Sequence, residues 1–296
     1  LEASMTQAYG TDWEALFYNF NYAPLAAASI GQVHRTLSPD GRQIVLKIQY
    51  PGVAQSIASD VDNIAALLRL SGLLPEGIDI QPLLDDAKVQ LQGEADYLKE
   101  AKFLDAFGTV LAADDRFTVP EVLHDLTHEN VLAMTYVAGA PIESLAEQPQ
   151  AERDRVMSAL IELMLMELFE LKMVQTDPNF ANYQYNASTG AIVLLDFGAT
   201  RQFKASFGNN YKKLARAAIE GDRKKLVIAA ERIGYSMGDV NSQYQDLVLD
   251  IFTLLLEPLT QDVLYDFAGS DIPGRMTSLA ESAGDFRDFW QAPPSE

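Results

Sequence analysis

The sequence contains no cysteine among its 296 residues, and this absence excludes several kinds of chemistry. Disulfide bonds, thiolate zinc sites and cysteine nucleophiles all need the thiol. Histidine is also scarce, because His34, His124 and His128 are the whole set and their spacing does not match metal ligands. The nucleophile elbow Gly-x-Ser-x-Gly is absent as well. We therefore expect the histidines to be structural or surface residues.

Positive charge is the next shortage. Lys and Arg total 22 against 42 Asp and Glu, which gives a formal net charge of −20. An acidic surface repels the phosphates of nucleic acids and anionic lipid headgroups. The composition therefore predicts a solvated protein surface and no nucleic-acid partner.

Long uninterrupted apolar runs are missing too. Within the best candidate for a membrane span, residues 156–174, four side chains are charged: Glu162, Glu167, Glu170 and Lys172. Four charges would be costly inside a bilayer, so we interpret this stretch as a buried core helix and predict no transmembrane segment. No signal peptide is visible. Because the chain begins at Leu1 rather than Met, we expect a piece of a longer protein.

The first half of the chain alternates between strand and helix patterns. Two strands are predicted over residues 25–35 and 43–50, joined by a Ser-Pro-Asp-Gly turn at 38–41. Helices are predicted over 53–70 and 85–107, and further strands over 117–123 and 130–136. The sequence Ala-Gly-Ala-Pro at 138–141 then interrupts the pattern. We predict a domain boundary here, between a β-containing N-lobe, 1–137, and a helical C-lobe, 138–296.

The second half is mainly helical. Helices are predicted over 153–173, 209–220, 222–233 and 246–256, with a short strand over 192–195. Asp222 is well placed to cap the third of these helices and Gly234 to end it. The fold class is therefore α+β, with a small β-containing N-lobe and a mainly helical C-lobe.

Three polar residues in the second half form the most informative pattern. Asp177 is followed by Asn182, and Asp196 then ends an apolar run and is followed by Phe-Gly. Protein kinases use a catalytic Asp-x-x-x-x-Asn and an Asp-Phe-Gly whose carboxylate holds Mg²⁺. Carboxylate and amide oxygens suit this hard cation. We predict that Asp177 is catalytic and that Asn182 and Asp196 bind the metal. The pattern also indicates a two-lobed, protein-kinase-like fold.

An alanine-rich stretch occupies the place of a kinase phosphate-binding loop. Compared with Gly-x-Gly-x-x-Gly-x-Val, Gly31 and Val33 match, but Ala26 and Ala28 replace the first two glycines. Alanine resists the positive φ that glycine adopts easily, so this loop would be stiffer. Ordinary strand filler is the alternative interpretation. The nucleotide-binding residues predicted in this stretch are Ala26, Ala27, Ala28, Ser29, Gly31 and Val33.

A lysine and a glutamate complete the pattern. Lys47 lies in Val-Leu-Lys-Ile, which is similar to the kinase strand whose lysine contacts phosphates and pairs with a helix glutamate. We choose Glu100 as its partner. Asp96 and Glu100 are four residues apart and would share a helix face, where like charges repel unless a cation lies near. The alternatives are an exposed lysine and a solvated acidic face. Residues 134–139 lie where a kinase has its interlobe hinge, so Tyr136 and Val137 are predicted to offer backbone groups to adenine.

These residues together resemble the UbiB/ADCK atypical kinase-like family, in its coenzyme Q biosynthesis branch. The resemblance covers most of the chain. The residues that carry it are 24–34, 45–53, Glu94-x-Asp96-Tyr97 with Glu100-Ala101, Gln175-Thr176-Asp177-Pro178-Asn179, and 194–201. The alanine-rich loop, the Glu-x-Asp element and the Gln-Thr-Asp-Pro-Asn loop are unusual among kinases.

The resemblance implies specific roles. Lys47 and Glu100 would form an ion pair at the active site, and the cofactors would be ATP and Mg²⁺. Glu94 and Asp96 would form a regulatory element that meets an N-terminal Lys-x-Gly-Gln motif in relatives. That motif is not in this sequence, and we expect a final helical portion beyond Glu296. The implied location is the cytoplasm or the periphery of an inner membrane. The implied partners are quinone-biosynthesis enzymes and lipid or quinone precursors.

Two functions of different classes remain open. The first is an ATPase or small-molecule kinase that supports ubiquinone biosynthesis, with an unknown phosphate acceptor. The second is a pseudokinase scaffold that binds nucleotide without phosphoryl transfer and organises biosynthetic enzymes. An aminoglycoside-type kinase is a weaker third option, because it lacks the Glu-x-Asp helix and the alanine loop.

Overall fold

The computed structural model describes residues 1–71, 80–177, 179–235 and 242–283. Contacts divide the chain into two units. Unit 1 comprises Leu1–Leu165 and Met173–Arg201, and unit 2 comprises Met166–Lys172 and Gln202–Glu296. Both sides of the boundary predicted after Val137 fall within unit 1, and that lobe boundary stays a prediction.

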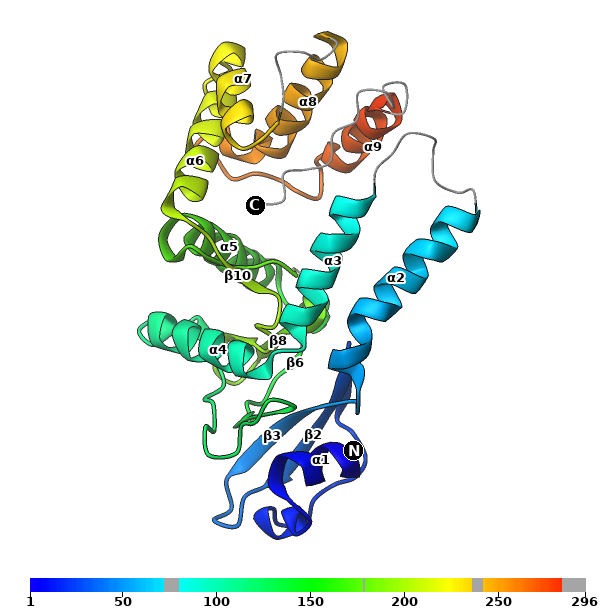
Figure 1. Ribbon diagram of the computed structural model, residues 1–296. Coiled ribbons are helices and arrows are strands. Elements are labelled where there is room, and N and C mark those ends of the chain that lie inside the picture. Colours follow the sequence, from blue (N-terminus) through cyan, green and yellow to red (C-terminus); the bar gives the residue numbers. More distant parts are fainter. Residues whose placement is uncertain (72–79, 178, 236–241, 284–296) are drawn as a thin grey trace. The chain divides into compact units, whose positions relative to one another are not determined.

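Unit 1 is built on a four-stranded antiparallel sheet with the order β1-β2-β3-β5. Its strands are β1 (Ala26–Ala28), β2 (Gly31–Leu37), β3 (Gln43–Gln49) and β5 (Val131–Thr135). Figure 1 labels two of these strands, β2 and β3. The predicted turn between β2 and β3 is confirmed, since Gly41 donates to the carbonyl of Ser38 at a φ of 85°. The single strand predicted over 25–35 is wrong. The chain reverses after Ala28, and β1 folds back to pair with β2.

The two faces of β3 have different roles. Ile44, Leu46 and Ile48 are almost fully buried in a core with Met5 of helix α1 (Glu2–Tyr9) and with an aromatic cluster around Trp13. Because side chains alternate along a strand, Lys47 points to the opposite face. The alternation of side chains along β3 therefore places the apolar core on one face of the sheet and Lys47 on the other.

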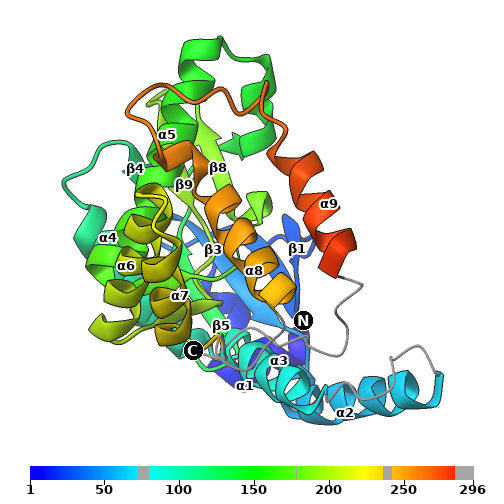
Figure 2. The ribbon, with the colours of Figure 1, turned by 90° about the horizontal axis from the view of Figure 1, so that it is seen from above.

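Three helices follow β3: α2 (Val53–Ser71), α3 (Gln81–Glu94) and α4 (Tyr97–Leu111). Helices α2 and α3 lie side by side (Figures 1 and 2). The single helix predicted over 85–107 is wrong, because the helix is interrupted at Ala95 and Asp96. The carboxylate of Asp96 accepts a hydrogen bond from the Lys99 N–H at 2.9 Å and so caps α4. Asp96 precedes the helix and does not share a helix face with Glu100.

A second sheet in unit 1 has the order β4-β9-β8-β6. Its strands are β4 (Phe117–Thr118), β9 (Ala191–Leu194), β8 (Tyr183–Asn186) and β6 (Ala140–Pro141). A small pair of strands, β7 (Met173–Gln175) and β10 (Thr200–Gln202), brackets the two polar loops. The strand predicted over 117–123 is too long, because only two residues pair continuously.

Helix α5 (Gln150–Met166) continues into a π-helical turn, η3 (Glu167–Leu171). Val156, Ala159 and Leu163 bury one face of α5, whereas Met157 and Met164 are exposed. The stretch predicted as a buried core helix is therefore buried on one face only. In the described part of the chain, no helix is both long enough and apolar enough to cross a membrane.

Unit 2 is helical, with α6 (Ala205–Ile219), α7 (Arg223–Arg232), α8 (Ser242–Leu255) and α9 (Ile272–Ala283) (Figure 2). A short 3₁₀ turn lies at Glu257–Leu259 in this unit, and three more lie in unit 1, at Trp13–Leu16, Ile142–Glu147 and Phe180–Asn182. The predicted ends of α7 are confirmed: Asp222 accepts from the Lys225 N–H at 3.0 Å, and Gly234 adopts a φ of 103°. Leu226, Ala230 and Leu249 are central to the core of this unit.

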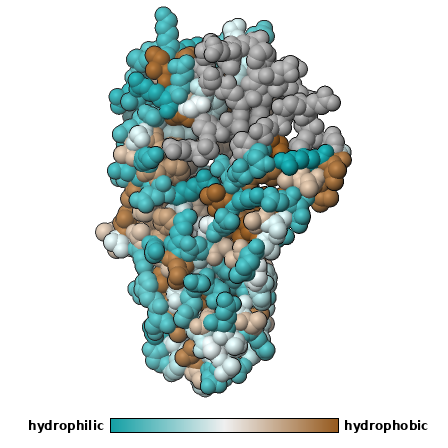
Figure 3. All heavy atoms as spheres, in the orientation of Figure 1, coloured by the Kyte–Doolittle hydropathy of each residue, from teal (hydrophilic) through white to brown (hydrophobic). Residues whose placement is uncertain are grey.

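Hydrophilic residues predominate on the face shown in the space-filling view, where apolar residues form small scattered groups (Figure 3). This distribution agrees with the formal charge of −20.

Candidate functional site

Lys47 lies between two carboxylates in unit 1. Its Nζ atom is 2.9 and 3.0 Å from the two carboxylate oxygens of Glu100, and 3.0 Å from Oδ2 of Asp196. Strand β3 supplies the lysine, helix α4 supplies the glutamate, and the loop after β9 supplies the aspartate. Three segments far apart in the sequence thus meet at one ammonium group.

The burial of these side chains decides between the alternatives left open by the sequence. Glu100 is 1% exposed and Lys47 is 8% exposed, so neither an exposed lysine nor a solvated acidic face describes them. Burial, the largest effect, raises the pKa of Glu100 to about 7. Burial alone would lower the pKa of Lys47, but the carboxylates of Glu100 and Asp196 outweigh it and raise that pKa, so the ammonium stays charged.

Asp196 also remains ionised, because the Lys47 ammonium lies beside its carboxylate. Burial opposes its charge, yet Lys47 and a hydrogen bond from the Gly198 N–H hold the pKa of this carboxyl below its ordinary value. A carboxylate that is ionised and close to a lysine is suited to bind a metal ion that arrives with phosphates.

Asp177 and Asn182 lie on the adjacent loop. The Asn182 amide donates to the backbone carbonyl of Asp177 at 3.1 Å and to its Oδ2 atom at 3.2 Å. The Leu195 N–H donates to the carbonyl of Asn182 at 3.0 Å, which joins this loop to the segment that carries Asp196. Pro178 lies outside the described residues.

The two members of the Glu-x-Asp element have different surroundings. Glu94 ends α3 and is half-buried; burial chiefly, and then the negative charges of Asp196 and Asp177, raise its pKa. Asp96 instead uses its carboxylate to cap α4. The structure therefore associates Glu94, but not Asp96, with the acidic groups of the site.

The alanine-rich stretch is strand β1, with exposed Ala26 and Ala27 and a partly buried Ala28. It ends in a turn at Ser29 and Ile30. Gly31 approaches β3 so closely that a Cβ atom there would lie 2.3 Å from the Ile48 carbonyl oxygen. This contact is a packing reason for glycine at position 31.

Val33 pairs with Lys47 across β2 and β3 and lies beside it on the sheet. At the predicted hinge, Tyr136 donates its backbone N–H to the carbonyl of Gln43 at 3.0 Å, and the Arg35 guanidinium stacks 3.8 Å from its ring centroid. This N–H is therefore already engaged within the sheet. The assignment of Tyr136 and Val137 to adenine binding stays a prediction.

Two residues within the sequence motifs were given no role by sequence reasoning. The carboxamide of Gln175 bonds to the backbone at both Asp177 and Asp196. The side chain of Tyr97 is fully buried, and its hydroxyl has no hydrogen-bond partner among the residues that the structure describes. The unusual Gln-Thr-Asp-Pro-Asn form of the loop was the available signal for Gln175.

The oxygen atoms of Asp196 and Asn182 suit Mg²⁺ bound together with phosphates better than they suit a metal ion held by protein side chains alone. Across the described ranges, no cluster of three or more His, Asp or Glu side chains could hold a metal ion. His34 is buried against Phe20, and His124 is exposed beside Asp105, in agreement with structural and surface roles. One carboxylate from Asp196 and one amide from Asn182 suit Mg²⁺, which commonly takes its other ligands from phosphates and water.

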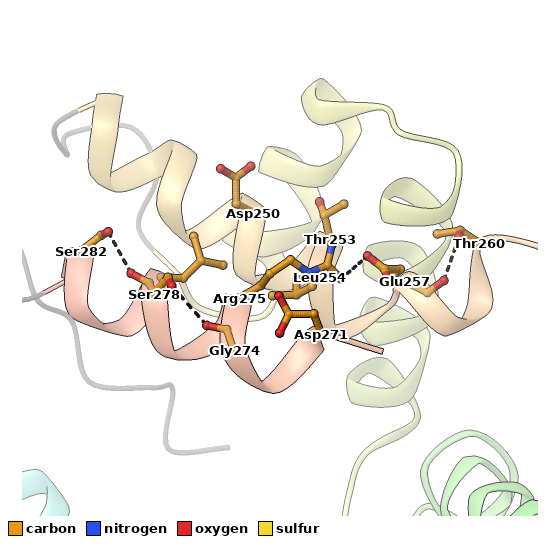
Figure 4. A pocket seen from close by; sticks show the side chains of 11 residues that line it. Asp250, Thr253, Leu254, Glu257, Thr260, Asp271, Gly274, Arg275, Ser278 and Ser282 are labelled. Carbon is orange, nitrogen blue, oxygen red and sulfur yellow. Dashed lines mark hydrogen bonds and ion pairs between the residues drawn. The ribbon is translucent and has the colours of Figure 1, made fainter. Parts of the chain in front are cut away.

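Unit 2 contains a separate open cavity of about 810 Å³ between α8, α9 and the turn that joins them (Figure 4). Leu254 and Leu279 contribute apolar surface. Arg275 is paired with Glu257, and the hydroxyls of Ser278 and Ser282 donate to helix carbonyls. The groups that would perform phosphoryl transfer are not among those lining this cavity.

Comparisons with known proteins identify the relatives of this chain. Residues 1–230 match the ABC1 atypical kinase-like domain. The chain is 38% identical over 278 residues to "Atypical kinase COQ8, mitochondrial" of Saccharomyces cerevisiae, covering 93% of this chain and 56% of that protein. It is 37% identical over 275 residues to "Atypical kinase COQ8B, mitochondrial" of Rattus norvegicus, covering 93% of this chain and 52% of that one. The chain thus spans about half the length of these two curated relatives.

The fold also matches a solved structure, a complex of Rv3197 with erythromycin from Mycobacterium tuberculosis. The TM-score is 0.71 at 25% identity, and the match covers 94% of this chain and 69% of that one. These matches confirm the predicted resemblance and the α+β kinase-like fold class.

Proposed function

Because the chain belongs to the ABC1 atypical kinase-like family, we propose that it binds Mg-ATP and transfers or hydrolyses the γ-phosphoryl group. The contact of Lys47 with both Glu100 and Asp196 carries this proposal. The phosphate acceptor is water or a small molecule, so the activity is that of an ATPase or an atypical kinase.

Each residue has a part in the proposed reaction. Lys47, held by Glu100, contacts the nucleotide phosphates, and the turn after β1 covers them. Asp177 orients the attacking hydroxyl or water and accepts its proton as the new P–O bond forms and the bond to ADP breaks. Asn182 and Asp196 hold Mg²⁺, which supplies positive charge to the phosphates. Positioning and electrostatics provide most of the rate enhancement in such reactions.

Nucleotide affinity tests the metal assignment. ADP binding is measured by titration calorimetry with and without Mg²⁺, for the wild type and for Asp196→Asn. The wild type is expected to bind more tightly with Mg²⁺, and the variant to lose most of that gain because an amide is a weaker ligand than a carboxylate. Equal magnesium dependence in both proteins would remove Asp196 from the metal site.

The scaffold alternative rests on a specific observation. Strand β1 is regularly paired to β2, and alanine methyl groups stand where kinases have flexible glycine. Such a stiff loop fits nucleotide binding without turnover. A sensitive phosphate-release assay separates the two functions: release above the level of Asp177→Asn supports catalysis, whereas equal rates in the two proteins favour the scaffold.

The names of the relatives support a proposal for the biological setting. Their names contain COQ8 and place them in mitochondria. We propose that this chain likewise supports ubiquinone biosynthesis, at the periphery of an inner membrane, alongside quinone-biosynthesis enzymes and lipid or quinone precursors. Loss of ubiquinone in a strain that carries Asp196→Asn in the whole protein would support this role, and normal ubiquinone would contradict it.

A further inference from the structure

The side chain of Gln175 joins the two loops of the proposed site. Its Oε1 atom accepts a hydrogen bond from the Asp177 N–H at 2.6 Å. Its Nε2 atom donates to the backbone carbonyl of Asp196 at 3.3 Å. A single carboxamide at the end of β7 therefore contacts the backbone of the proposed catalytic residue and that of the proposed metal ligand.

The neighbouring Thr176 adds a second connection to the same segment. Its N–H and its Oγ1 hydroxyl both donate to the carbonyl of Ala199, at 3.4 and 2.7 Å. Residues 175 and 176 thus hold the segment 196–199 near both of its ends. Strands β7 and β10 are also paired, so the base of both loops is fixed by backbone contacts.

The chemistry of the carboxamide suits this double contact. Gln offers an acceptor and a donor about two ångströms apart on one rigid plane, whereas Glu offers acceptors only and Met offers neither of comparable strength. The amide of Gln175 can therefore satisfy an N–H on one loop and a C=O on the other at the same time. The backbone at Asp177 and Asp196 is held directly, and their carboxylates are left available.

We propose that Gln175 is a positioning residue that sets the separation between Asp177 and Asp196. The inference rests on the proposed function, because it assigns Gln175 to the same site. Gln175 does not contact the reacting atoms; it acts through the backbone of the two aspartates. Loss of its side chain therefore disturbs metal-dependent binding and turnover before it disturbs nucleotide binding itself.

The test uses three variants of the chain. Gln175→Met removes both hydrogen bonds at similar length, and Gln175→Glu keeps the acceptor for the Asp177 N–H but loses the donor to Asp196. Asn130→Leu is the matched control, because it removes a carboxamide that donates to the backbone of Ser4 at 2.9 Å, between other segments. Hydrogen exchange at the Asp177 amide, ADP affinity with and without Mg²⁺, and phosphate-release kinetics are measured for each.

The expected results distinguish positioning from general stability. Gln175→Met is expected to accelerate exchange at Asp177 and to leave magnesium-free ADP affinity unchanged. Since misplacement by about 1 Å can cost on the order of a hundredfold in rate, we expect kcat to fall by at least about tenfold. The gain in ADP affinity that Mg²⁺ gives should weaken in the same variant. Gln175→Glu should retain protection at Asp177 yet lose magnesium-dependent affinity. Asn130→Leu should lower thermal stability alone.

Two outcomes would overturn the inference. Unaltered exchange at Asp177 in Gln175→Met would show that the hydrogen bond is not formed. Wild-type magnesium dependence and kcat in that variant would show a structural role only. Failure of the proposed function looks different, because the wild type itself would then show no magnesium-dependent affinity for ADP, and the inference would fall with it.

Discussion

Lys47 forms ion pairs with two carboxylates of the site, those of Glu100 and Asp196. Glu100, its closest partner, has no exposed side-chain surface, and Asp196 is about one-third exposed. Removal of one partner from a buried ion pair leaves an uncompensated charge, which typically costs about 3 to 5 kcal/mol. We expect Lys47→Met to lower the free energy of unfolding by roughly this amount, as measured by urea denaturation.

The loss of unfolding free energy in Lys47→Met should depend on pH in one direction. In Lys47→Met, Glu100 loses its cation, so its pKa lies above the value of about 7 in the wild type. A carboxyl whose pKa is raised by folding contributes stability that is lost as pH rises through that pKa. The deficit should therefore be larger at pH 8 than at pH 6. The double variant Lys47→Met/Glu100→Leu should recover part of it, and no recovery would argue against the ion pair.

Tyr97 offers a contrast, because its hydroxyl is buried without a partner in the described structure. Burial of an unpaired hydroxyl costs about 1 to 3 kcal/mol, so Tyr97→Phe is expected to leave the free energy of unfolding unchanged or to increase it. Tyr185→Phe is the matched control, because the Tyr185 hydroxyl donates to Glu152 at 2.5 Å. We expect that variant to be less stable, and a clear loss in Tyr97→Phe would reveal a partner for its hydroxyl. Thermal unfolding of both variants provides the measurement.

At the residue scale, the sequence pattern located the charged groups well but not their connections. Lys47, Glu100 and Asp196 could be proposed because their residue types and their order along the chain match the chemistry of a metal-nucleotide site. The hydrogen bonds of Gln175 could not, since they depend on how β7 ends and on which carbonyls then face its side chain. The surroundings of the Tyr97 hydroxyl likewise depend on tertiary packing.

At the scale of elements, helix periods predicted α2 and α7 closely, whereas two breaks were missed. Residues 85–107 keep an amphipathic period across position 96, but α3 ends at Glu94, and the hydrogen bond that Asp96 accepts caps the start of α4. Residues 25–35 contain several Ala and one Gly, which have low strand propensity, and no strong turn signal marks the reversal at Ser29 and Ile30. The interruption at Asp96 therefore divides the first predicted element into two helices. The turn at Ser29 and Ile30 divides the second into two strands.

Helix α5 is joined to strand β8 by an interaction that depends on pH. Glu152 accepts from Arg155 at 2.6 and 3.0 Å and from the Tyr185 hydroxyl; Arg155 first, and then Tyr185, lower the pKa of Glu152 to about 2. A carboxylate whose pKa is lowered by folding stabilises the protein above its unfolded pKa and loses this effect as pH falls.

We therefore expect the difference in unfolding free energy between the wild type and Glu152→Gln to be present at pH 7. It should shrink as the pH falls below about 4.5, the ordinary value for glutamate, towards 2. Denaturant titrations between pH 7 and pH 2 test this. A difference that grows on acidification would contradict the assignment.

At the scale of the whole molecule, the two units have separate apolar cores. Leu226 is 1% exposed within the core of unit 2, and Leu46 is fully buried within that of unit 1. Truncation of a buried leucine typically costs about 2 to 5 kcal/mol. We expect Leu226→Ala to reduce hydrogen-exchange protection in α6, α7 and α8 while β2 and β3 keep theirs. Equal loss in both units would show that they unfold together.

The bend between α3 and α4 has a mechanical consequence. The Gln49 amide donates to the Ala95 carbonyl at 2.6 Å, so the strand that carries Lys47 is braced against the start of the helix that carries Glu100. Lys47 and Glu100 are thus held on a strand and a helix that contact each other, whereas Asp196 lies on a loop. If the proposed function holds, we expect a nucleotide phosphate beside Lys47 to displace Asp196 rather than Glu100, which would leave the carboxylate of Asp196 available to the metal ion.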